Sequence, residues 1–213
     1  PVLFWVHGGA HRFGSSTHYP GQELAAKGVV VVTINYRLGP LGFLSHPELT
    51  AEGCSGNQGL LDTVFALQWV QRNISQFGGN PANVTVFGES AGGHSTCAMF
   101  TSPLCKGLVH RAIAQSGVGA QAIQLLDKPG AVPISAHDTG EILGEVIGCE
   151  KGKDQLREMR EIDVDELISK TAAFPIPGVI IDGHCQPENP ISIIRNGQHN
   201  DIPLMIGSNA DAG

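Results

Sequence analysis

The sequence has few positive charges and no long apolar run, and each of these absences excludes a class of protein. Its 213 residues carry 13 Lys and Arg against 20 Asp and Glu, which gives a formal net charge of −7. A chain with this acidic balance is a poor partner for the phosphate backbone of nucleic acids. No apolar run reaches the length of a membrane span. We therefore expect a globular domain with no nucleic-acid partner and no membrane-spanning segment.

The sequence also lacks the usual motifs of metal and phosphate sites. Its five cysteines, at positions 54, 97, 105, 149 and 185, include no C-x-x-C pair, and their spacing fits no metal site. We interpret them as free or buried thiols. The glycine-rich segment at 7–14 contains no G-K-[ST] and no G-x-G-x-x-G that opens a helix, so neither kind of phosphate-binding loop is indicated. No metal or organic cofactor is implied.

The order of the predicted elements favours an α/β fold. We expect strands at 1–6, 29–34, 84–87, 111–115 and 202–207, a short extended piece at 178–183, and helices at 19–27, 60–77, 91–101 and 190–196. The run at 29–34 is β-branched without polar alternation, which predicts a central strand buried on both faces, and the strand at 202–207 also reads as buried. Strands that alternate with helices predict a mostly parallel central sheet flanked by helices.

Four further segments carry specific expectations. One side of the helix at 60–77 is apolar at positions three or four apart, namely Leu60, Val64, Leu67, Val70, Ile74 and Phe77. The long connection at 35–56 is rich in Gly, Pro and Ser, and we expect it to be irregular and to border the substrate site. We expect residues 137–171 to form a helical lid or cap, and residues 118–136 to form a loop.

The most informative stretch is F-G-E-S-A-G-G at 87–93, which contains G-x-S-x-G as Gly88, Ser90 and Gly92. A predicted strand precedes it and a segment of small residues able to form a helix follows it. Strand, tight turn and helix form the context of a nucleophile elbow. The glycines let the strand and the helix cross closely, and the strained turn exposes the serine hydroxyl to a substrate carbonyl. Ser90 is therefore a candidate nucleophile.

The glycine-rich segment at 7–14 suits a second role in the same chemistry. In an esterase such a loop supplies backbone N–H groups to an oxyanion hole. The expected donors are Gly9 and Ala10, together with the N–H of Ala91 directly after Ser90. Small residues matter here because the substrate oxygen must approach the backbone closely.

At this point the chain resembles the type-B carboxylesterase family, which includes the cholinesterases and bacterial para-nitrobenzyl esterases. The resemblance rests on H-G-G-A at 7–10, N-Y-R-L-G-P-L-G-F at 35–43, G-N-Q-G-L-L-D at 56–62, F-G-G-N-P at 77–81, F-G-E-S-A-G-G at 87–93 and Q-S-G at 115–117. It implies the α/β-hydrolase fold, with residues 1–213 as part of one domain. The chain begins with Pro1 inside a predicted strand, and we expect it to be an internal piece of a longer protein, truncated at both ends.

The resemblance also implies residue roles. It makes Ser90 the nucleophile and Gly9, Ala10 and Ala91 the oxyanion hole. It matches Glu89 to an acidic residue that tunes the site electrostatically; the alternative is an exposed turn residue. The small-molecule substrate would be a carboxylic ester, hydrolysed through an acyl-serine intermediate.

The chain departs from the family pattern at the triad acid. The family places that acid in a stretch like G-x-N-x-D-E-G, where this chain has G-S-N-A-D-A-G at 207–213. The acid position is Ala212, and the adjacent Asp211 is a weak substitute because neighbouring loop residues usually point in different directions. Impaired catalysis follows, and a non-catalytic binding domain is the alternative function.

Two other expectations come from the resemblance. The family's catalytic histidine lies downstream of Gly213, so His94 is expected to be a helix-face residue and His7 a structural part of its loop. A disulfide of many relatives would join Cys149 to the residue before Arg160, where this chain has Met159. That bridge is expected to be absent.

Overall fold

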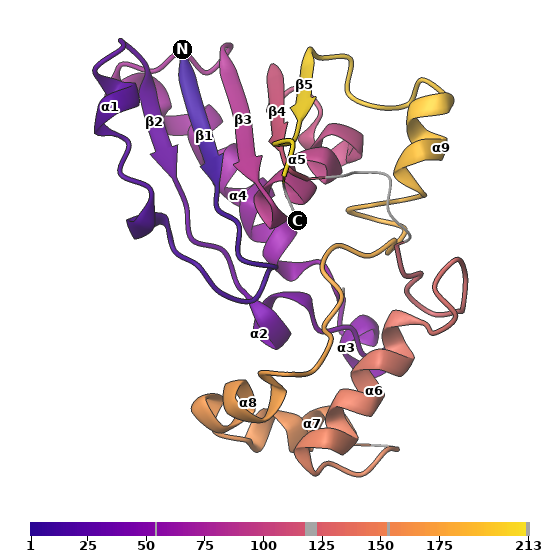
Figure 1. The fold of residues 1–213 in the computed structure, drawn as a ribbon. Coiled ribbons are helices and arrows are strands. Elements are labelled where there is room, and N and C mark those ends of the chain that lie inside the picture. Colours follow the sequence, from indigo (N-terminus) through magenta and orange to yellow (C-terminus); the bar gives the residue numbers. More distant parts are fainter. Residues whose placement is uncertain (54, 118–122, 153, 212–213) are drawn as a thin grey trace.

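A parallel sheet with the strand order β2-β1-β3-β4-β5 organises the chain (Figure 1). The computed structural model describes residues 1–53, 55–117, 123–152 and 154–211. The strands are β1 (Val2–Val6), β2 (Val30–Thr33), β3 (Val84–Glu89), β4 (Arg111–Gln115) and β5 (Leu204–Gly207). This parallel sheet with its helices confirms the predicted α/β class.

The helices of the described residues follow the chain between and beyond these strands. The α-helices are α1 (Gln22–Ala25), α2 (Gly39–Phe43), α3 (Pro47–Ala51), α4 (Gln58–Asn73), α5 (Ala91–Thr101), α6 (Ala136–Ile147), α7 (Gln155–Glu161), α8 (Val164–Thr171) and α9 (Pro190–Arg195). Short 3-10 turns are η1 (Ser16–His18), η2 (Ile74–Phe77) and η3 (Pro103–Cys105). None of the helices in this part of the chain has the length and apolarity to cross a membrane.

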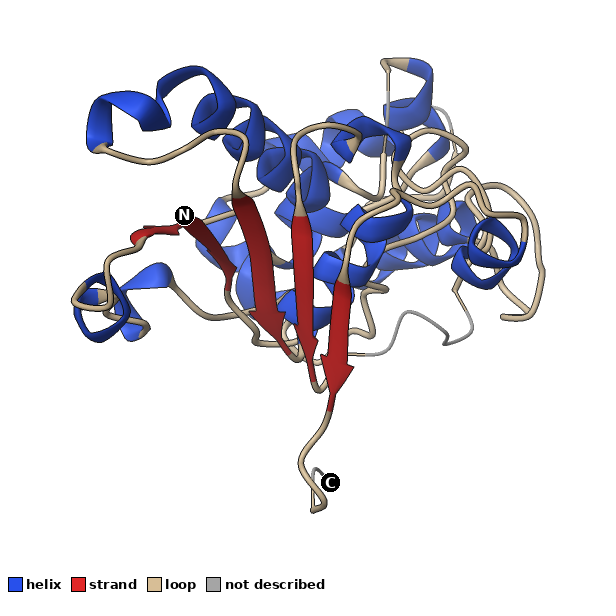
Figure 2. Cartoon of the chain, turned by 90° about the horizontal axis from the view of Figure 1, so that it is seen from above, coloured by secondary structure: helices blue, strands red, loops and turns tan. Residues whose placement is uncertain are grey.

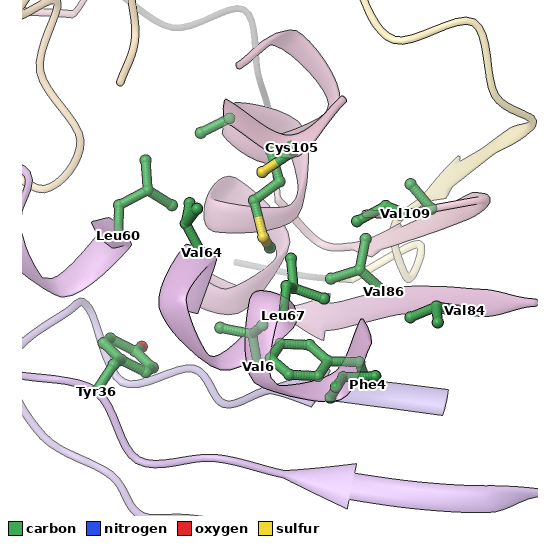
Figure 3. Packing of buried hydrophobic residues seen from close by; sticks show 14 of the residues in the cluster. Phe4, Val6, Tyr36, Leu60, Val64, Leu67, Val84, Val86, Cys105 and Val109 are labelled. Carbon is green, nitrogen blue, oxygen red and sulfur yellow. The ribbon is translucent and has the colours of Figure 1, made fainter. Parts of the chain in front are cut away.

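Alternate residues of the central strands build the main core. Phe4 and Val6 of β1 and Val86 of β3 are buried on the face that α4 and α5 cover (Figures 2 and 3). The opposite face carries Trp5, whose ring lies 4.7 Å from that of Phe87. This alternation follows from the two-residue repeat of a strand. Side chains therefore pack on both faces of the sheet at β1 and β3. These are the two strands that lead into the candidate site.

Helix α4 confirms the predicted apolar stripe over most of its length. The buried positions are Leu60, Val64, Leu67, Val70 and Ile74. Phe77 was expected on the same stripe, and this is wrong because its side chain is 62% exposed. The chain tightens into η2 at Ile74, and the change from 3.6 to three residues per turn rotates Phe77 away from the core.

The expected burial of two strands is wrong. β2 lies at one edge of the sheet formed by the described residues, and its side chains are only partly buried. β5 lies at the other edge, and Met205 and Ile206 are 66% and 55% exposed. An apolar, β-branched run predicts a strand, but its position across the sheet depends on which strands pair beside it.

The connection at 35–56 contains more regular structure than expected. Helices α2 and α3 lie within it, and each has a proline in its first turn, at Pro40 and Pro47. Proline suits this position because its missing N–H would have no partner in the helix. The prediction of an irregular segment is therefore wrong for about half of its length.

The predicted helical segment at 137–171 is confirmed as helical, and α6, α7 and α8 lie beyond α2 and α3, away from the sheet (Figure 1). Leu143, Ile147, Cys149 and Met159 form a second small core there. The described cysteines, Cys97, Cys105, Cys149 and Cys185, are buried, in line with the expectation of free or buried thiols. Cys54 and residues 118–122 of the predicted loop lie outside the described residues.

Candidate active site

Ser90 occupies a strained turn between β3 and α5, as the elbow motif predicts. Its backbone has φ 54° and ψ −121°, a conformation that costs energy for a residue with a side chain. The Ser90 N–H donates to the Gln115 carbonyl at 2.9 Å, and the His94 N–H donates to the Ser90 carbonyl at 2.9 Å. One bond ties the turn to β4 and the other starts the helix, so the unusual backbone is held from both sides.

The glycines of the motif allow the strand and the helix to cross at close range. A Cβ placed at Gly88 would lie 2.5 Å from the Gly92 carbonyl carbon. A Cβ at Gly92 would overlap the Val6 carbonyl of β1, and one at Gly93 would lie 2.8 Å from the Gln115 oxygen. Real side chains do not fit at such distances, so these positions require glycine. The small residues of the elbow thus allow α5 to sit directly on the sheet.

The parallel register brings the loop after β1 to the same edge of the sheet. Val6 pairs with Gly88, and Glu89 pairs with Gln115. The chain therefore leaves β1, β3 and β4 side by side. We call residues 7–14 the glycine loop; it continues from β1 with positive φ angles of 108° at Gly9, 54° at Ala10 and 57° at His11.

Tyr36 and His7 hold the base of the glycine loop. The Tyr36 hydroxyl donates to the His7 carbonyl at 2.8 Å, and the two rings stack with centroids 4.5 Å apart. His7 is completely buried, and its Nδ1 lies 2.8 Å from the Gly8 carbonyl oxygen. Burial raises the pKa of Tyr36 above its ordinary value, so the hydroxyl remains a donor. This agrees with the structural role expected for His7.

A chamber of about 280 Å³ opens at Ser90. Its lining comes from three parts of the chain: Ala10 and His11 of the glycine loop; Ser90, Ala91, His94 and Ala98 of the elbow and α5; and Ile123, Gly178, Val179, Gln186 and Pro190 from later segments. The chamber therefore brings together Ser90, Ala10 and Ala91 of the predicted site. Gly9 lies beside Ala10 in the glycine loop but is not part of the lining.

Other lining residues had no individual signal in the sequence. His11 follows H-G-G-A directly, and that adjacency was the only available pointer. Val179 comes from the piece at 178–183, which was expected only to be extended, and Gln186 comes from a stretch for which nothing was expected. His94 was expected on the helix face; it is half-buried there and also borders the chamber. None of the described residues in the connection at 35–56 lines this chamber, contrary to expectation.

Glu89 lies near the chamber without lining it. Glu89 is exposed. A Cβ placed at Gly8 would lie 3.1 Å from the Glu89 carboxylate and 3.3 Å from Ser90 Cβ. The carboxylate is therefore close to the first turn of the glycine loop. Of the two acid positions, Asp211 is exposed and Ala212 lies outside the described residues. Within the described ranges, no group of three or more His, Cys, Asp and Glu side chains is arranged to hold a metal ion.

His11 is buried in the wall of the chamber, and burial changes its pKa. Burial, with His94 and His7 nearby, lowers its pKa from 6.5 to about 4, against the opposing effect of a hydrogen bond to the Ala91 backbone. The ring is therefore neutral at neutral pH. A neutral imidazole between the glycine loop and α5 adds no charge to the chamber, and its two ring nitrogens remain available for hydrogen bonds.

Comparisons with known proteins agree with this geometry. The family model described as "Carboxylesterase family" matches residues 1–213. Para-nitrobenzyl esterase of Bacillus subtilis is 42% identical over 228 residues, which cover 100% of this chain and 44% of that protein. Fumonisin B1 esterase of Sphingopyxis macrogoltabida is 41% identical, covering 100% of this chain and 39% of that protein.

A solved structure has the same arrangement of elements. The chain superposes on a carboxylesterase of Geobacillus stearothermophilus with a TM-score of 0.87 and 37% identity, covering 99% of this chain and 45% of that one. The chain spans less than half the length of these relatives. The fold is the α/β-hydrolase fold, as predicted, and the chain belongs to the carboxylesterase family.

Proposed function

We propose that the natural polypeptide carrying this chain is a serine carboxylesterase with Ser90 as its nucleophile. The observation that carries the proposal is the strained Ser90 backbone, with φ 54°, at a chamber that Ala10 and Ala91 also line. A serine in this conformation presents its hydroxyl to a substrate at the end of a strand. The N–H groups of Gly9, Ala10 and Ala91 form the oxyanion hole.

The reaction is acyl transfer to water through a covalent intermediate. The Ser90 oxygen bonds to the ester carbonyl carbon while its proton passes to a histidine, which the family resemblance places beyond position 213. The carbonyl oxygen becomes an oxyanion and accepts hydrogen bonds from the oxyanion-hole N–H groups. The carbon–oxygen bond to the alcohol then breaks, and the alcohol leaves with the proton from the histidine. Water repeats the sequence and releases the acid and free Ser90.

The acid position sets how fast this chemistry runs. An acid normally orients the histidine, and its loss in serine proteases costs roughly 10⁴ in rate. With Ala212 at that position, we propose a slow esterase unless Asp211 acts in its place. Glu89 tunes the field at the glycine loop from its position beside Gly8. Because the base lies outside it, the 213-residue chain alone should not hydrolyse esters at a rate ordinary for the family.

We further propose that residues 137–171 form a cap over the substrate entrance. A second cavity of about 560 Å³ supports this, because it shares Ile123, Gly178 and Val179 with the Ser90 chamber. The cap contributes Thr139 and Ile142 to that second cavity. A substrate that extends beyond Val179 would therefore meet α6.

Labelling with a fluorophosphonate, read by intact mass, tests the proposal on the natural polypeptide. Its serine-specific mass shift should appear in the wild type and in Ser75→Ala, which removes an exposed hydroxyl remote from the chamber, and should be lost in Ser90→Ala. Labelling that survives in Ser90→Ala would assign another nucleophile and overturn the proposal.

The same assay with Ala212→Glu separates the functional alternatives. Fast labelling of both the wild type and Ala212→Glu means that another group, such as Asp211, orients the histidine. Labelling only after Ala212→Glu means that the remaining machinery is intact and the acid has been lost. No labelling in either protein would contradict the esterase assignment and favour a binding domain.

A further inference from the structure

His11 joins the glycine loop to the first turns of α5. Its Nε2 lies 2.9 Å from Ser95 Oγ, between two buried residues that are 84 positions apart in the chain. The Ala91 backbone also lies close enough to the His11 ring to raise its pKa, against the larger opposite effect of burial. Ala91 and Ser95 are one helical turn apart and therefore lie on the same side of α5. One side chain from the loop thus bonds to Ser95 and lies beside the Ala91 backbone in the helix that follows Ser90.

The surroundings of His11 hold its ring in one place. The ring lies 4.6 Å from that of Phe43, centroid to centroid, and a Cβ at Gly178 would lie 2.5 Å from Nδ1. The His11 carbonyl accepts a hydrogen bond from the Gly39 N–H at 2.7 Å. Side chain and backbone are therefore both tied to other elements. His11 cannot change its position without moving Ala10, the residue that precedes it.

The position of His11 matters because two separate parts of the chain supply the N–H groups of the oxyanion hole. Gly9 and Ala10 belong to the glycine loop, whereas Ala91 belongs to α5. The distance between these sources must be kept constant for all N–H groups to meet one oxygen, and donors off by about 1 Å can cost roughly 10²-fold in rate. The positive φ angles at Ala10 and His11, which both carry side chains, make the loop strained, so it needs an external restraint.

We propose that His11 is a positioning residue which, through Ser95, holds the glycine loop at the distance from α5 that the oxyanion requires. This inference rests on the proposed function for its catalytic part. The structural part, a loop held by one hydrogen-bonded side chain, is independent of whether the protein hydrolyses esters. The two parts can therefore be tested by separate measurements.

Hydrogen exchange tests the structural part. In the natural polypeptide, His11→Phe retains an aromatic ring and removes the hydrogen bond, and Ser95→Ala removes the other partner. Both changes should raise amide exchange of peptides covering 7–14 by roughly fivefold or more, while peptides covering β3 stay as in the wild type. His18→Phe, a substitution at an exposed histidine nearby, is the matched control. Unchanged exchange in both His11→Phe and Ser95→Ala would overturn the proposal.

Kinetics with a para-nitrophenyl ester test the catalytic part. Each variant should lower kcat by roughly 10- to 100-fold with little change in KM, because the loss falls on the transition state. Binding of a trifluoromethyl ketone, which forms an oxyanion with the serine, should weaken in parallel. The double variant should be no slower than the worse single variant, and His11→Gln, which can still bond Ser95, should recover most of kcat.

Two outcomes would separate this inference from the proposed function. If the loop loosens but even the wild type lacks esterase activity, the proposed function fails and the structural role of His11 stands. If the loop loosens and kcat does not change, the positioning role is overturned while the esterase assignment stands.

Discussion

Gly92 of α5 packs directly on the carbonyl group of Val6 in β1. A Cβ at Gly92 would lie 2.8 Å from the Val6 carbonyl carbon and 3.0 Å from the His7 oxygen, and both of these are backbone atoms that cannot turn away. The contact places the first turn of α5 against the start of the glycine loop. It thereby sets the geometry of the whole candidate site.

Gly92→Ala should therefore destabilise the fold, although alanine is the better helix former by about 1 kcal/mol. The overlap with β1 should outweigh that gain and lower the free energy of unfolding by about 2 kcal/mol or more, as measured by urea unfolding. Gly207→Ala is the matched control, because a Cβ there would meet no atom within 4 Å. A Gly92→Ala protein as stable as Gly207→Ala would contradict this account.

Stability should fall in acid because of His11. The pKa of His11 in the folded chain, about 4, lies below the ordinary value of 6.5. Between these two pH values His11 is protonated in the unfolded chain and neutral in the folded chain. The free energy of unfolding should therefore decrease as the pH falls from about 6.5 to about 4 and should level off below that. This one group should account for a decrease of about 3 kcal/mol.

Urea unfolding at several pH values measures this effect. His11→Phe should be less stable at pH 7 than the wild type and should lose less stability on going to pH 4.5, whereas His18→Phe should follow the wild type. Other groups also titrate in this range, including His137, whose pKa burial lowers. The difference in pH dependence between the wild type and His11→Phe isolates the contribution of His11. Parallel curves for the wild type and His11→Phe would rule out the effect.

Asp62 should contribute more to the stability of the fold than an ordinary surface carboxylate does. It accepts the Arg37 backbone N–H at 2.9 Å and pairs with the Arg37 guanidinium at 2.8 and 2.7 Å. This two-point contact fixes the chain next to Tyr36, which in turn holds His7. Asp62→Asn should cost about 1–2 kcal/mol of unfolding free energy.

Arg157→Gln provides the comparison, because Arg157 is exposed and its acidic partners Asp154 and Glu161 are 3.9 Å away. That change should cost less than about 0.5 kcal/mol. Thermal unfolding of both variants measures the contrast, and equal losses would show that the geometry of the Arg37 pair adds nothing.

Gln155 should be central to the attachment of helices α6 to α8 to the rest of the chain. Its side chain is buried, its Oε1 lies 2.9 Å from His46 Nε2, and its Nε2 donates to the Glu141 carbonyl at 3.0 Å. One amide therefore joins α7 to α3 and α6. Gln155→Leu removes both of these hydrogen bonds and leaves the buried His46 Nε2 without this partner, which should cost about 2–4 kcal/mol.

Limited proteolysis measures whether the loss of Gln155 loosens the α6–α8 region alone. Cleavage between α6 and α8 should become faster in Gln155→Leu while the sheet stays resistant. Glu161→Gln, at an exposed position of α7, should digest like the wild type. Uniform faster cleavage over the whole chain would instead show that Gln155 stabilises the entire fold and does not specifically hold α6 to α8.

The sequence predicted most strands and helices because their signals are local. Strand β3, the turn at Ser90 and helix α5 follow from apolar residues, two glycines and small residues in direct succession. The same local patterns could not predict exposure. β2 looks central from its valines, and Phe77 looks buried from its spacing, but strand order and a tightened last turn placed both nearer to solvent.

The sequence by itself determined the nucleophile elbow, because a glycine-flanked serine between a strand and a helix has few conformations open to it. Only the tertiary structure decided what surrounds that serine. The parallel pairing of β1 with β3 brings His11 to Ser95 across 84 residues, and the return of the chain after α8 brings Val179 and Gln186 to the chamber. Such contacts depend on strand order and loop closure, which no short stretch of sequence encodes.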